Sequence, residues 1–275
     1  MKGFTQRLNE AMDAAKSLVC IGLDPDPALM PVADVLAFNK GIVDATKNLV
    51  CAYKPNLAFY EALGIPGLKA LEGTVAHIRA VAPRVLIIGD GKRGDVGHAS
   101  SRYAQAMFDV WGFDAATVNA SGGGESLAPF FERPDKGAFV WCRSSNPGAA
   151  EFQGVAQTVG GRLYERIAES ARSWDKHGNI GLVVGATYPA ELTAVRRLCP
   201  DMPILLPGVG AQGGDLEASV KAGVDWKGRG LLVSSSRGII YASRSTTGYA
   251  TAARSAAKDL RDSINGILDA EGKEW

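Results

Sequence analysis

The segment VLIIGDGKRGD, residues 85–95, joins an apolar half to a charged half. The run Val85–Gly89 carries no charge and is rich in β-branched residues, whereas Asp90, Lys92 and Asp95 follow at once. A short apolar run of this kind is typical of a strand that is buried on both faces, as in a parallel sheet covered by helices. The charged residues then begin where the predicted strand ends.

Seven other short apolar runs resemble this one, and segments with helical spacing separate them. The predicted strands are Leu18–Leu23, Val50–Lys54, Val85–Gly89, Ala116–Asn119, Ala138–Cys142, Ile180–Val184, Ile204–Leu206 and Leu231–Ser234. The predicted helices include Val35–Lys47, Leu68–Ala80, Ser100–Phe108, Leu163–Lys176 and Ala190–Leu198, the last with Pro189 at its start, where a missing N–H is tolerated. Alternation of strands with helices predicts a parallel α/β sheet.

Eight such units within 275 residues favour a single-domain (β/α)8 TIM barrel over residues 1–275. An open doubly wound sheet is the alternative, because periodicity does not show closure. The least regular stretch, Asn119–Lys136, is predicted to be a loop that carries one short helix. No linker-like segment divides the chain.

The charge balance limits the choice of partners. The sequence has 30 basic and 29 acidic side chains, a formal net charge of +1. Because binding to a polyanion needs a basic field, nucleic acid is not expected as a partner. A phosphate-bearing ligand would have to be held locally by a few groups.

Metal and membrane signals are weak. The four cysteines form no CxxC pair and are predicted to be buried, reduced thiols, and the three histidines lack metal-ligand spacing, so no metal is expected. The sequence has neither an apolar signal core nor an 18-residue apolar run. We therefore expect no membrane association and a cytoplasmic location.

Charged residues stand at the ends of three neighbouring predicted strands. Asp24 follows the first strand, Lys54 ends the second, and Asp90 and Lys92 follow the third. In a barrel the site lies at these carboxyl ends, and residues two apart in an extended segment point the same way. Opposite charges about 4 Å apart attract by roughly 4 kcal/mol at an effective dielectric near 20. Such an array would hold a lysine charged and ready to donate a proton, although a solvated salt-bridge cluster is the alternative.

Two later loops suggest a phosphate site. The segment PGVGAQG, residues 207–213, follows the seventh strand, and Arg237 follows the eighth. Loops after these two strands commonly bind phosphate in barrels, so glycine N–H groups, Gln212 and Arg237 are predicted ligands. Glycine turns with a surface arginine would be the plainer interpretation. After the fifth strand, Ser145 suits either recognition of a base amide or an ordinary turn.

Together these stretches resemble the orotidine 5′-monophosphate decarboxylase family, in its longer bacterial branch. The resemblance covers nearly the whole chain and is most specific in GDGKRGDVG (89–97), SNPGA (145–149) and PGVGAQG (207–213). It implies a homodimeric barrel that converts orotidine 5′-phosphate to UMP and carbon dioxide without metal or organic cofactor.

The same resemblance implies roles for the site residues. Asp90 would lie beside the substrate carboxylate, Lys92 would protonate C6, and Lys54 would bridge Asp90 and the ribose. The other implied contacts are Asp24 to a ribose hydroxyl, Asp95 to the partner subunit's site, Ser145 to the pyrimidine amide, and Gln212 with Arg237 to the phosphate. The family often has threonine four residues after the second aspartate, but this chain has Ala99 there, so Ser100 is the candidate for that ribose contact.

Three other functions fit parts of the pattern. Sister barrel enzymes that act on pentulose or hexulose phosphates share the DxKxxD pattern. Those enzymes depend on Mg²⁺ and carry a glutamate after the second strand, where this chain has Tyr53-Lys54-Pro55. A dinucleotide-binding oxidoreductase would match GxGxxG, but that fingerprint should follow the first strand of its unit. A non-catalytic nucleotide-binding module would not need the acid–base array.

Overall fold

A computed structural model describes residues 2–158, 160–209 and 214–275, and its centre is a closed barrel of eight strands in chain order. Every neighbouring pair is parallel, and the last strand returns to the first, with Cys20 opposite Ser234. This closure confirms the (β/α)8 barrel and excludes the open sheet. The strands are β1 Val19–Leu23, β2 Ala52–Pro55, β3 Leu86–Arg93, β4 Ala115–Val118, β5 Gly137–Arg143, β6 Ile180–Val184, β7 Ile204–Pro207 and β8 Leu231–Ser235.

The strand prediction is confirmed within two residues at each bound, with one exception. The strand β3 continues to Arg93, four residues beyond its predicted end, so that Asp90 and Lys92 belong to the strand itself. Its pairing with β4 is irregular between Gly89 and Arg93. The irregular register lets a charged segment stay paired while it turns toward the barrel mouth.

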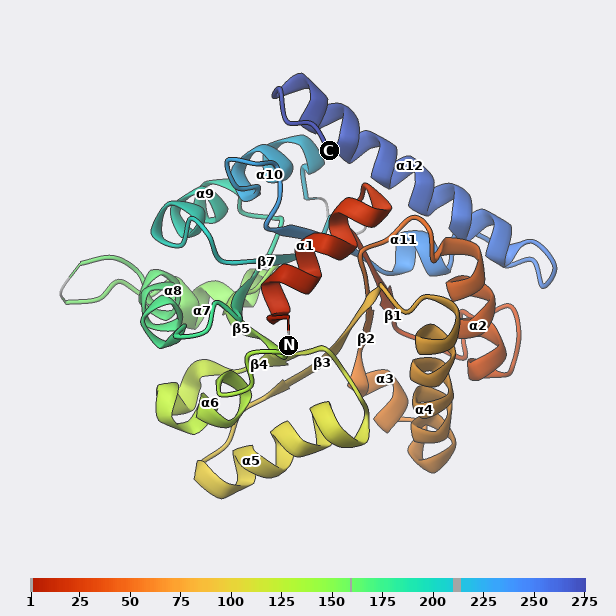
Figure 1. The fold of residues 1–275 in the computed structure, drawn as a ribbon, viewed down its shortest axis with the longest axis horizontal. Helices are drawn as coiled ribbons and strands as arrows, with labels where there is room; N and C mark the ends of the chain where they lie inside the picture. The colour runs from red at the N-terminus through yellow and green to blue at the C-terminus, as the bar shows by residue number, and fades with distance from the viewer. Residues whose placement is uncertain (1, 159, 210–213) are drawn as a thin grey trace.

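Helices surround the barrel, as Figure 1 shows. They are α1 Phe4–Ala15, α2 Val35–Thr46, α3 Leu57–Glu61, α4 Gly64–Val81, α5 Gly97–Gln105, α6 Gly123–Phe131, α7 Ala150–Gln153, α8 Leu163–Trp174, α9 Pro189–Leu198, α10 Leu216–Gly223, α11 Arg237–Ile240 and α12 Tyr249–Ala270, with short 3₁₀ turns at Ala120–Gly122 and Pro147–Ala149. The predicted helix Ser100–Phe108 is wrong in its bounds. It begins earlier as α5 and then widens into a π-helical turn, Ala106–Val110.

The helix α1, which the sequence analysis did not predict, crosses the end of the barrel opposite the site (Figure 1). Its Phe4 ring packs edge-on against Phe139 of β5, with the centroids 5.9 Å apart. Its Arg7 bonds to Asp114, which also accepts a 2.7 Å hydrogen bond from Arg79 of α4. We call Asp114, Arg7 and Arg79 the lower-end cluster. It ties α1 and α4 to the start of β4.

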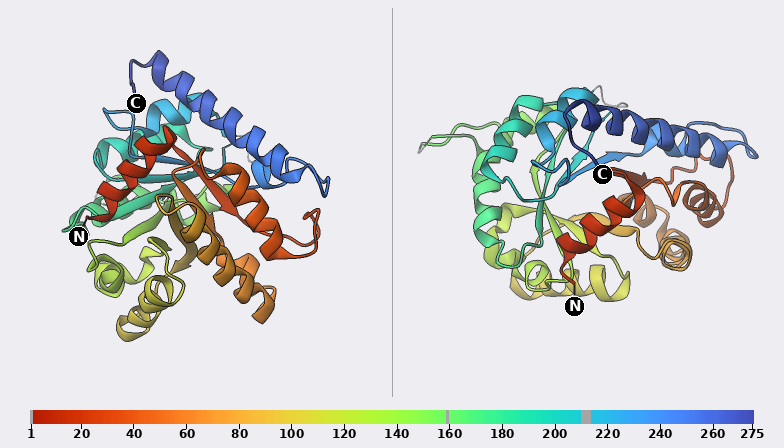
Figure 2. Two further views of the ribbon diagram at one scale, coloured as in Figure 1. Left: turned by 45° about the vertical axis from the view of Figure 1, so that its right-hand side comes forward. Right: turned by 45° about the horizontal axis from the view of Figure 1, so that its top comes forward.

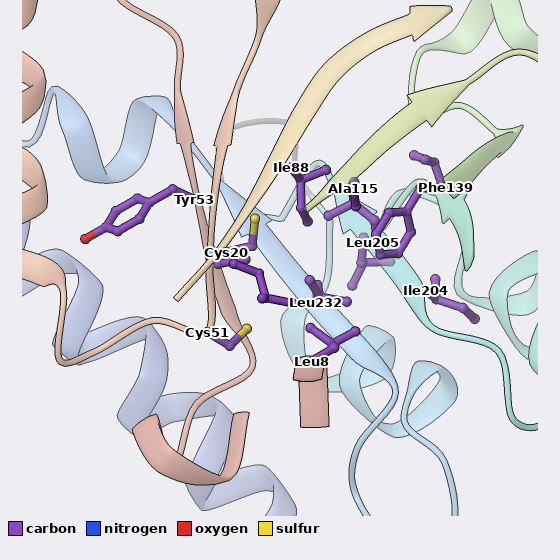
Figure 3. Close-up of a cluster of buried hydrophobic side chains, with 14 of the residues drawn as sticks. Leu8, Cys20, Cys51, Tyr53, Ile88, Ala115, Phe139, Ile204, Leu205 and Leu232 are labelled. Carbon is purple, nitrogen blue, oxygen red and sulfur yellow. The ribbon is translucent and has the colours of Figure 1, made fainter. Parts of the chain in front are cut away.

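Apolar side chains fill the barrel beneath its mouth. Figure 3 shows Ile88, Leu205, Leu232 and Phe139 converging from four strands, with Leu8 of α1 below them. All five are almost completely buried. The barrel interior is therefore filled below its mouth, so a site inside the barrel has room only at the carboxyl ends of the strands.

The fold tests the prediction for the cysteines. The four cysteines are buried and form no disulfide, as predicted. Across the part of the chain that the structure describes, no helix is long and apolar enough to cross a membrane. Residues 154–158 and 160–162, between α7 and α8, extend away from the barrel (Figure 2), and an antiparallel bridge joins Ala156 to Arg162.

Candidate active site

A cavity of about 490 Å³ opens at the carboxyl ends of the strands. Residues from the end of every strand line it, as expected for a barrel site. Six of the predicted site residues are among them: Asp24, Lys54, Asp90, Lys92, Ser145 and Arg237. The fold thus gathers side chains that are spread over more than 200 positions of the sequence.

A compact ionic group forms one wall of this cavity. The Asp90 carboxylate accepts hydrogen bonds from Lys54 Nζ at 2.7 Å and from Lys92 Nζ at 2.8 Å. The Thr117 hydroxyl of β4 donates to Asp90 at 2.8 Å and accepts from the Lys92 backbone N–H at 2.9 Å. We call Asp90, Lys54, Lys92 and Thr117 the mouth cluster. The alternative of a solvated surface cluster is wrong, because Lys54 and Asp90 are only 6% and 7% exposed.

Asp90 and Lys54, the two most deeply buried charged groups of the mouth cluster, are both ionised at neutral pH. Burial alone would raise the pKa of Asp90, but the ammonium groups of Lys54 and Lys92 outweigh it and hold that pKa well below its usual range. Burial alone would lower the pKa of Lys54, yet the Asp90 and Asp24 carboxylates raise it above its ordinary value. The carboxylate of Asp90 therefore remains ionised between two cations.

Lys92 differs from Lys54 in its surroundings. Its side chain is 38% exposed and faces the cavity, and its Nζ lies 5.9 Å from the ring centroid of Trp141 on β5. Its backbone has a φ of +45°, a left-handed conformation that is rare for residues other than glycine. The bond from its N–H to Thr117 holds this conformation in place. Strain of this kind is often found at functional positions.

The opposite wall carries the groups predicted to bind phosphate. Arg237 is exposed at the start of α11, and the neighbouring turns, which contain Gly208 and Ser236, also line the cavity. The strands β7 and β8 bring these turns together by pairing Pro207 with Ser234. The other side chain predicted to contact the phosphate, Gln212, lies outside the described residues.

Two buried polar atoms near this wall lack a partner among the described residues, Asp24 Oδ1 and Ser236 Oγ. They belong to neighbouring side chains, since a Cβ on Gly22 would lie 2.8 Å from Ser236 Cβ and 3.3 Å from Asp24 Oδ2. The Tyr241 hydroxyl fixes the Asp24 backbone by donating to its carbonyl at 2.8 Å. An unpartnered buried oxygen is costly, and a ligand hydroxyl would offset that cost.

The structure does not bring Asp95 and Ser100 to the cavity of their own chain. Asp95 is exposed, and its carboxylate accepts a 2.7 Å hydrogen bond from the Val96 N–H. Ser100 is buried and donates to the Asp95 carbonyl at 2.9 Å. Both residues lie on the turn between β3 and α5, beside the mouth.

Sequence reasoning missed Thr117, Trp141, Ser236 and Tyr241 as cavity residues. Thr117 stands in a predicted strand, and its alternation with apolar neighbours was the one available signal for an inward-facing position. Within the described ranges, no group of three or more His, Cys, Asp or Glu is arranged to hold a metal ion.

Comparisons with known proteins agree with this geometry. Residues 17–251 match the family model for the orotidine 5′-phosphate decarboxylase / HUMPS family. The chain is 48% identical over 266 residues to the orotidine 5′-phosphate decarboxylase of Dehalococcoides mccartyi, covering 95% of this chain and 97% of that protein. It is 47% identical over 272 residues to the protein of the same name from Thermomicrobium roseum, covering 96% and 95%. The solved Leishmania donovani OMP decarboxylase superposes with a TM-score of 0.85 at 38% identity, over 97% of this chain and 99% of that one.

Proposed function

Since this chain belongs to the orotidine 5′-phosphate decarboxylase / HUMPS family, we propose that it is a carboxy-lyase that converts orotidine 5′-phosphate to UMP and carbon dioxide. This reaction would serve de novo pyrimidine biosynthesis. The relatives named for this activity match the chain over almost their whole length. Their name favours the decarboxylase over the sugar-phosphate members of the family.

The observation that carries the proposal is the mouth cluster. Decarboxylation breaks the bond between C6 and the carboxylate carbon and leaves the electron pair on C6, with no conjugated group to take it. Lys92 supplies a fixed ammonium where that charge develops, and one of its protons then passes to C6 as carbon dioxide leaves. Asp90 holds the Lys92 ammonium in place through the 2.8 Å bond. Beside a bound substrate carboxylate, Asp90 would also repel the group that leaves.

The remaining predicted contacts surround this centre. Lys54 would reach the ribose from its bond to Asp90, and the unpartnered oxygen of Asp24 suits a ribose hydroxyl. Ser145 would meet the pyrimidine amide. Arg237, with Gln212, would hold the phosphate, which is remote from the broken bond, so that its binding energy can organise the reacting end.

We further propose that the enzyme is a homodimer in which Asp95 completes the partner subunit's site. The exposed position of Asp95, outside the cavity of its own chain, supports this arrangement. Ser100 stays a prediction as a ribose contact. Its hydrogen bond to the Asp95 carbonyl would hold the partner-facing turn in shape.

The test is to add orotidine 5′-phosphate to protein dialysed against EDTA and to follow the loss of orotate absorbance and the appearance of UMP. We expect turnover at the same rate with and without chelator, because the mouth cluster needs no metal to place its proton. Loss of turnover in EDTA that Mg²⁺ restores would favour the sugar-phosphate enzymes instead. Absence of turnover under both conditions would refute the decarboxylase.

A further inference from the structure

The carboxyl end of β5 departs from regular strand geometry where it meets the cavity. Trp141 pairs with Val183 of β6, but Arg143 pairs with Val184, so two steps on β5 face one step on β6. Such a β-bulge turns the following side chains away from simple alternation. Trp141 lines the cavity. Ser144 and Ser145 also line it, although consecutive residues of a regular strand would point to opposite faces.

Arg143 lies at this bulge and is 2% exposed. Its Nε donates to the Glu191 carboxylate, and its Nη1 donates to the Ser144 carbonyl at 3.2 Å. The guanidinium also lies 4.1 Å from the ring centroid of Tyr188. Glu191 is in the first turn of α9, where the helix dipole favours a carboxylate. One planar cation thus joins the end of β5 to the start of α9.

Three other hydrogen bonds act on the same short segment. The Gly185 N–H donates to the Arg143 carbonyl at 2.8 Å, and the Thr187 hydroxyl donates to the Ser145 carbonyl at 3.0 Å. On the other side, the Ser144 N–H donates to the Gln153 side chain at 2.8 Å. Hydrogen bonds from α7 and from the loop that leads into α9 therefore hold the backbone of residues 143–145 in place from outside the barrel.

We propose that Arg143 is a positioning residue that sets the place of Ser145 in the cavity. The proposal rests on the proposed function, in which Ser145 is the contact to the pyrimidine. Arg143 itself does not line the cavity, so it acts through the Ser144 backbone. The base end of the substrate would then depend on a cation that the substrate never touches.

Stability alone does not explain a buried arginine at this place. Replacement of a buried ion pair by apolar side chains is often neutral or stabilising, because desolvation offsets the attraction. A guanidinium does, however, bind a carboxylate and a carbonyl at fixed angles while it stacks on a ring, which a lysine ammonium does not do. The benefit that fits these contacts is a fixed geometry next to the site.

The test compares two ligands that share ribose and phosphate but differ in the base. Dissociation constants for UMP and for ribose 5-phosphate would be measured by calorimetry on the wild type, Arg143→Lys and Glu191→Gln. We expect the dissociation constant for UMP to rise by about tenfold in both variants, which is the effect of one misplaced hydrogen bond. The dissociation constant for ribose 5-phosphate should stay within about twofold of the wild-type value. The matched control is Arg196→Lys, a half-buried arginine of α9, the helix of Glu191, that donates to the carbonyls of Gly223 and Met202, far from the cavity lining. It should leave the ratio of the two constants unchanged.

A second measurement links Arg143 to Ser145 directly. Ser145→Ala should weaken UMP binding when it is introduced into the wild type. Combined with Arg143→Lys or Glu191→Gln, it should weaken UMP binding little further, because each change removes the same contact. Additive effects, or equal weakening of both ligands, would overturn the proposal. If Arg143→Lys does not fold, Glu191→Gln carries the test, since it keeps the arginine and the shape of its partner.

These measurements need no turnover, so they separate the two proposals. A wild type that prefers UMP over ribose 5-phosphate but releases no carbon dioxide would refute the decarboxylase and still test Arg143. A wild type with no such preference would overturn the positioning role whatever its activity.

Discussion

The barrel holds two buried aspartates at its opposite ends, each paired with two cations. Asp90 of the mouth cluster is 7% exposed and Asp114 of the lower-end cluster is 2% exposed. Each carboxylate also accepts a further hydrogen bond, from the Thr117 hydroxyl in one case and from the Ile87 N–H at 2.8 Å in the other. In charge and burial the two groups are nearly the same.

They differ in the type of cation and in what lies beyond it. Asp114 binds two arginines that fix helices to the barrel, and a guanidinium is poorly suited to proton transfer. Asp90 binds two lysines, and one of them faces a cavity. A lysine is able to transfer a proton. The same electrostatic pattern therefore supports the fold at one end and offers chemistry at the other.

The largest effect should come from making the mouth resemble the lower end. Lys92→Arg keeps the positive charge beside Asp90 but removes a transferable proton, so kcat should fall by at least about 10³-fold. Single-turnover rates would measure this, with Lys40→Arg on the surface of α2 as the control. Retained activity would mean that the proton comes from another group.

The next prediction is that the active site at the barrel mouth needs a residue from the partner chain, whereas the lower-end cluster is formed by one chain alone. Lys92→Ala and Asp95→Ala should each be nearly inactive as homodimers. In an equal mixture half of the dimers are hybrids, each with one intact site, so about a quarter of wild-type activity should return. Activity would be followed against time after mixing. No recovery, with subunit exchange confirmed by labelled chains, would show that Asp95 serves its own chain.

A smaller effect is expected for the arginine at the mouth. Unlike Arg7 and Arg79, Arg237 is exposed and is proposed to bind only the ligand phosphate. Arg237→Ala should weaken substrate binding by about 1.5–3 kcal/mol for each charge-assisted bond lost, with little change in thermal stability. A phosphate-free nucleoside should not distinguish the variant from the wild type. Arg84→Ala at the lower end is the control, and an equal loss on the nucleoside would place Arg237 in another role.

The smallest effect on activity should come from the lower end itself. Asp114→Asn leaves two guanidinium groups without a counter-charge, so the free energy of unfolding should fall by about 2–3 kcal/mol. The kcat of the folded protein should stay within about twofold. Urea unfolding and initial rates measure both quantities, and Asp44→Asn, at an exposed ion pair, should change stability by less than about 0.5 kcal/mol. A matching fall in kcat would show that the two ends are coupled.

The strands could be predicted because each is a local apolar run, but several helices were not, among them α1 and α12. The helix α1 looks polar, and only its spacing of Phe4, Leu8 and Met12 marks the face that covers the barrel. The helix α12 buries Ala253, Ala257, Ile264 and Leu268, and its first half gives a weak hydrophobic signal because it buries only the two alanines. Both helices are fixed by contacts with distant parts of the chain, which local patterns do not reveal.

Charged residues of the site were predictable because charge stands out after an apolar strand. Asp24, Lys54, Asp90 and Lys92 all follow or end such runs. Thr117 and Arg143 were not predictable, because their roles depend on the register between strands. Thr117 bonds to Asp90 across the β3–β4 pair, and Arg143 lies at the bulge in β5. A single sequence does not contain the register of strands that lie far apart.

The left-handed backbone at Lys92 has a bearing on engineering for heat resistance. Every residue with a side chain incurs roughly 1–2 kcal/mol in that conformation, from which glycine is free. Glycine at position 92 would therefore relax the backbone while removing the proposed proton donor. A selection for thermostability alone would favour such changes at the mouth and produce robust but inactive barrels. A useful library leaves residues 89–95 fixed and seeks its gains among the lower loops and outer helices, where stability and turnover do not compete.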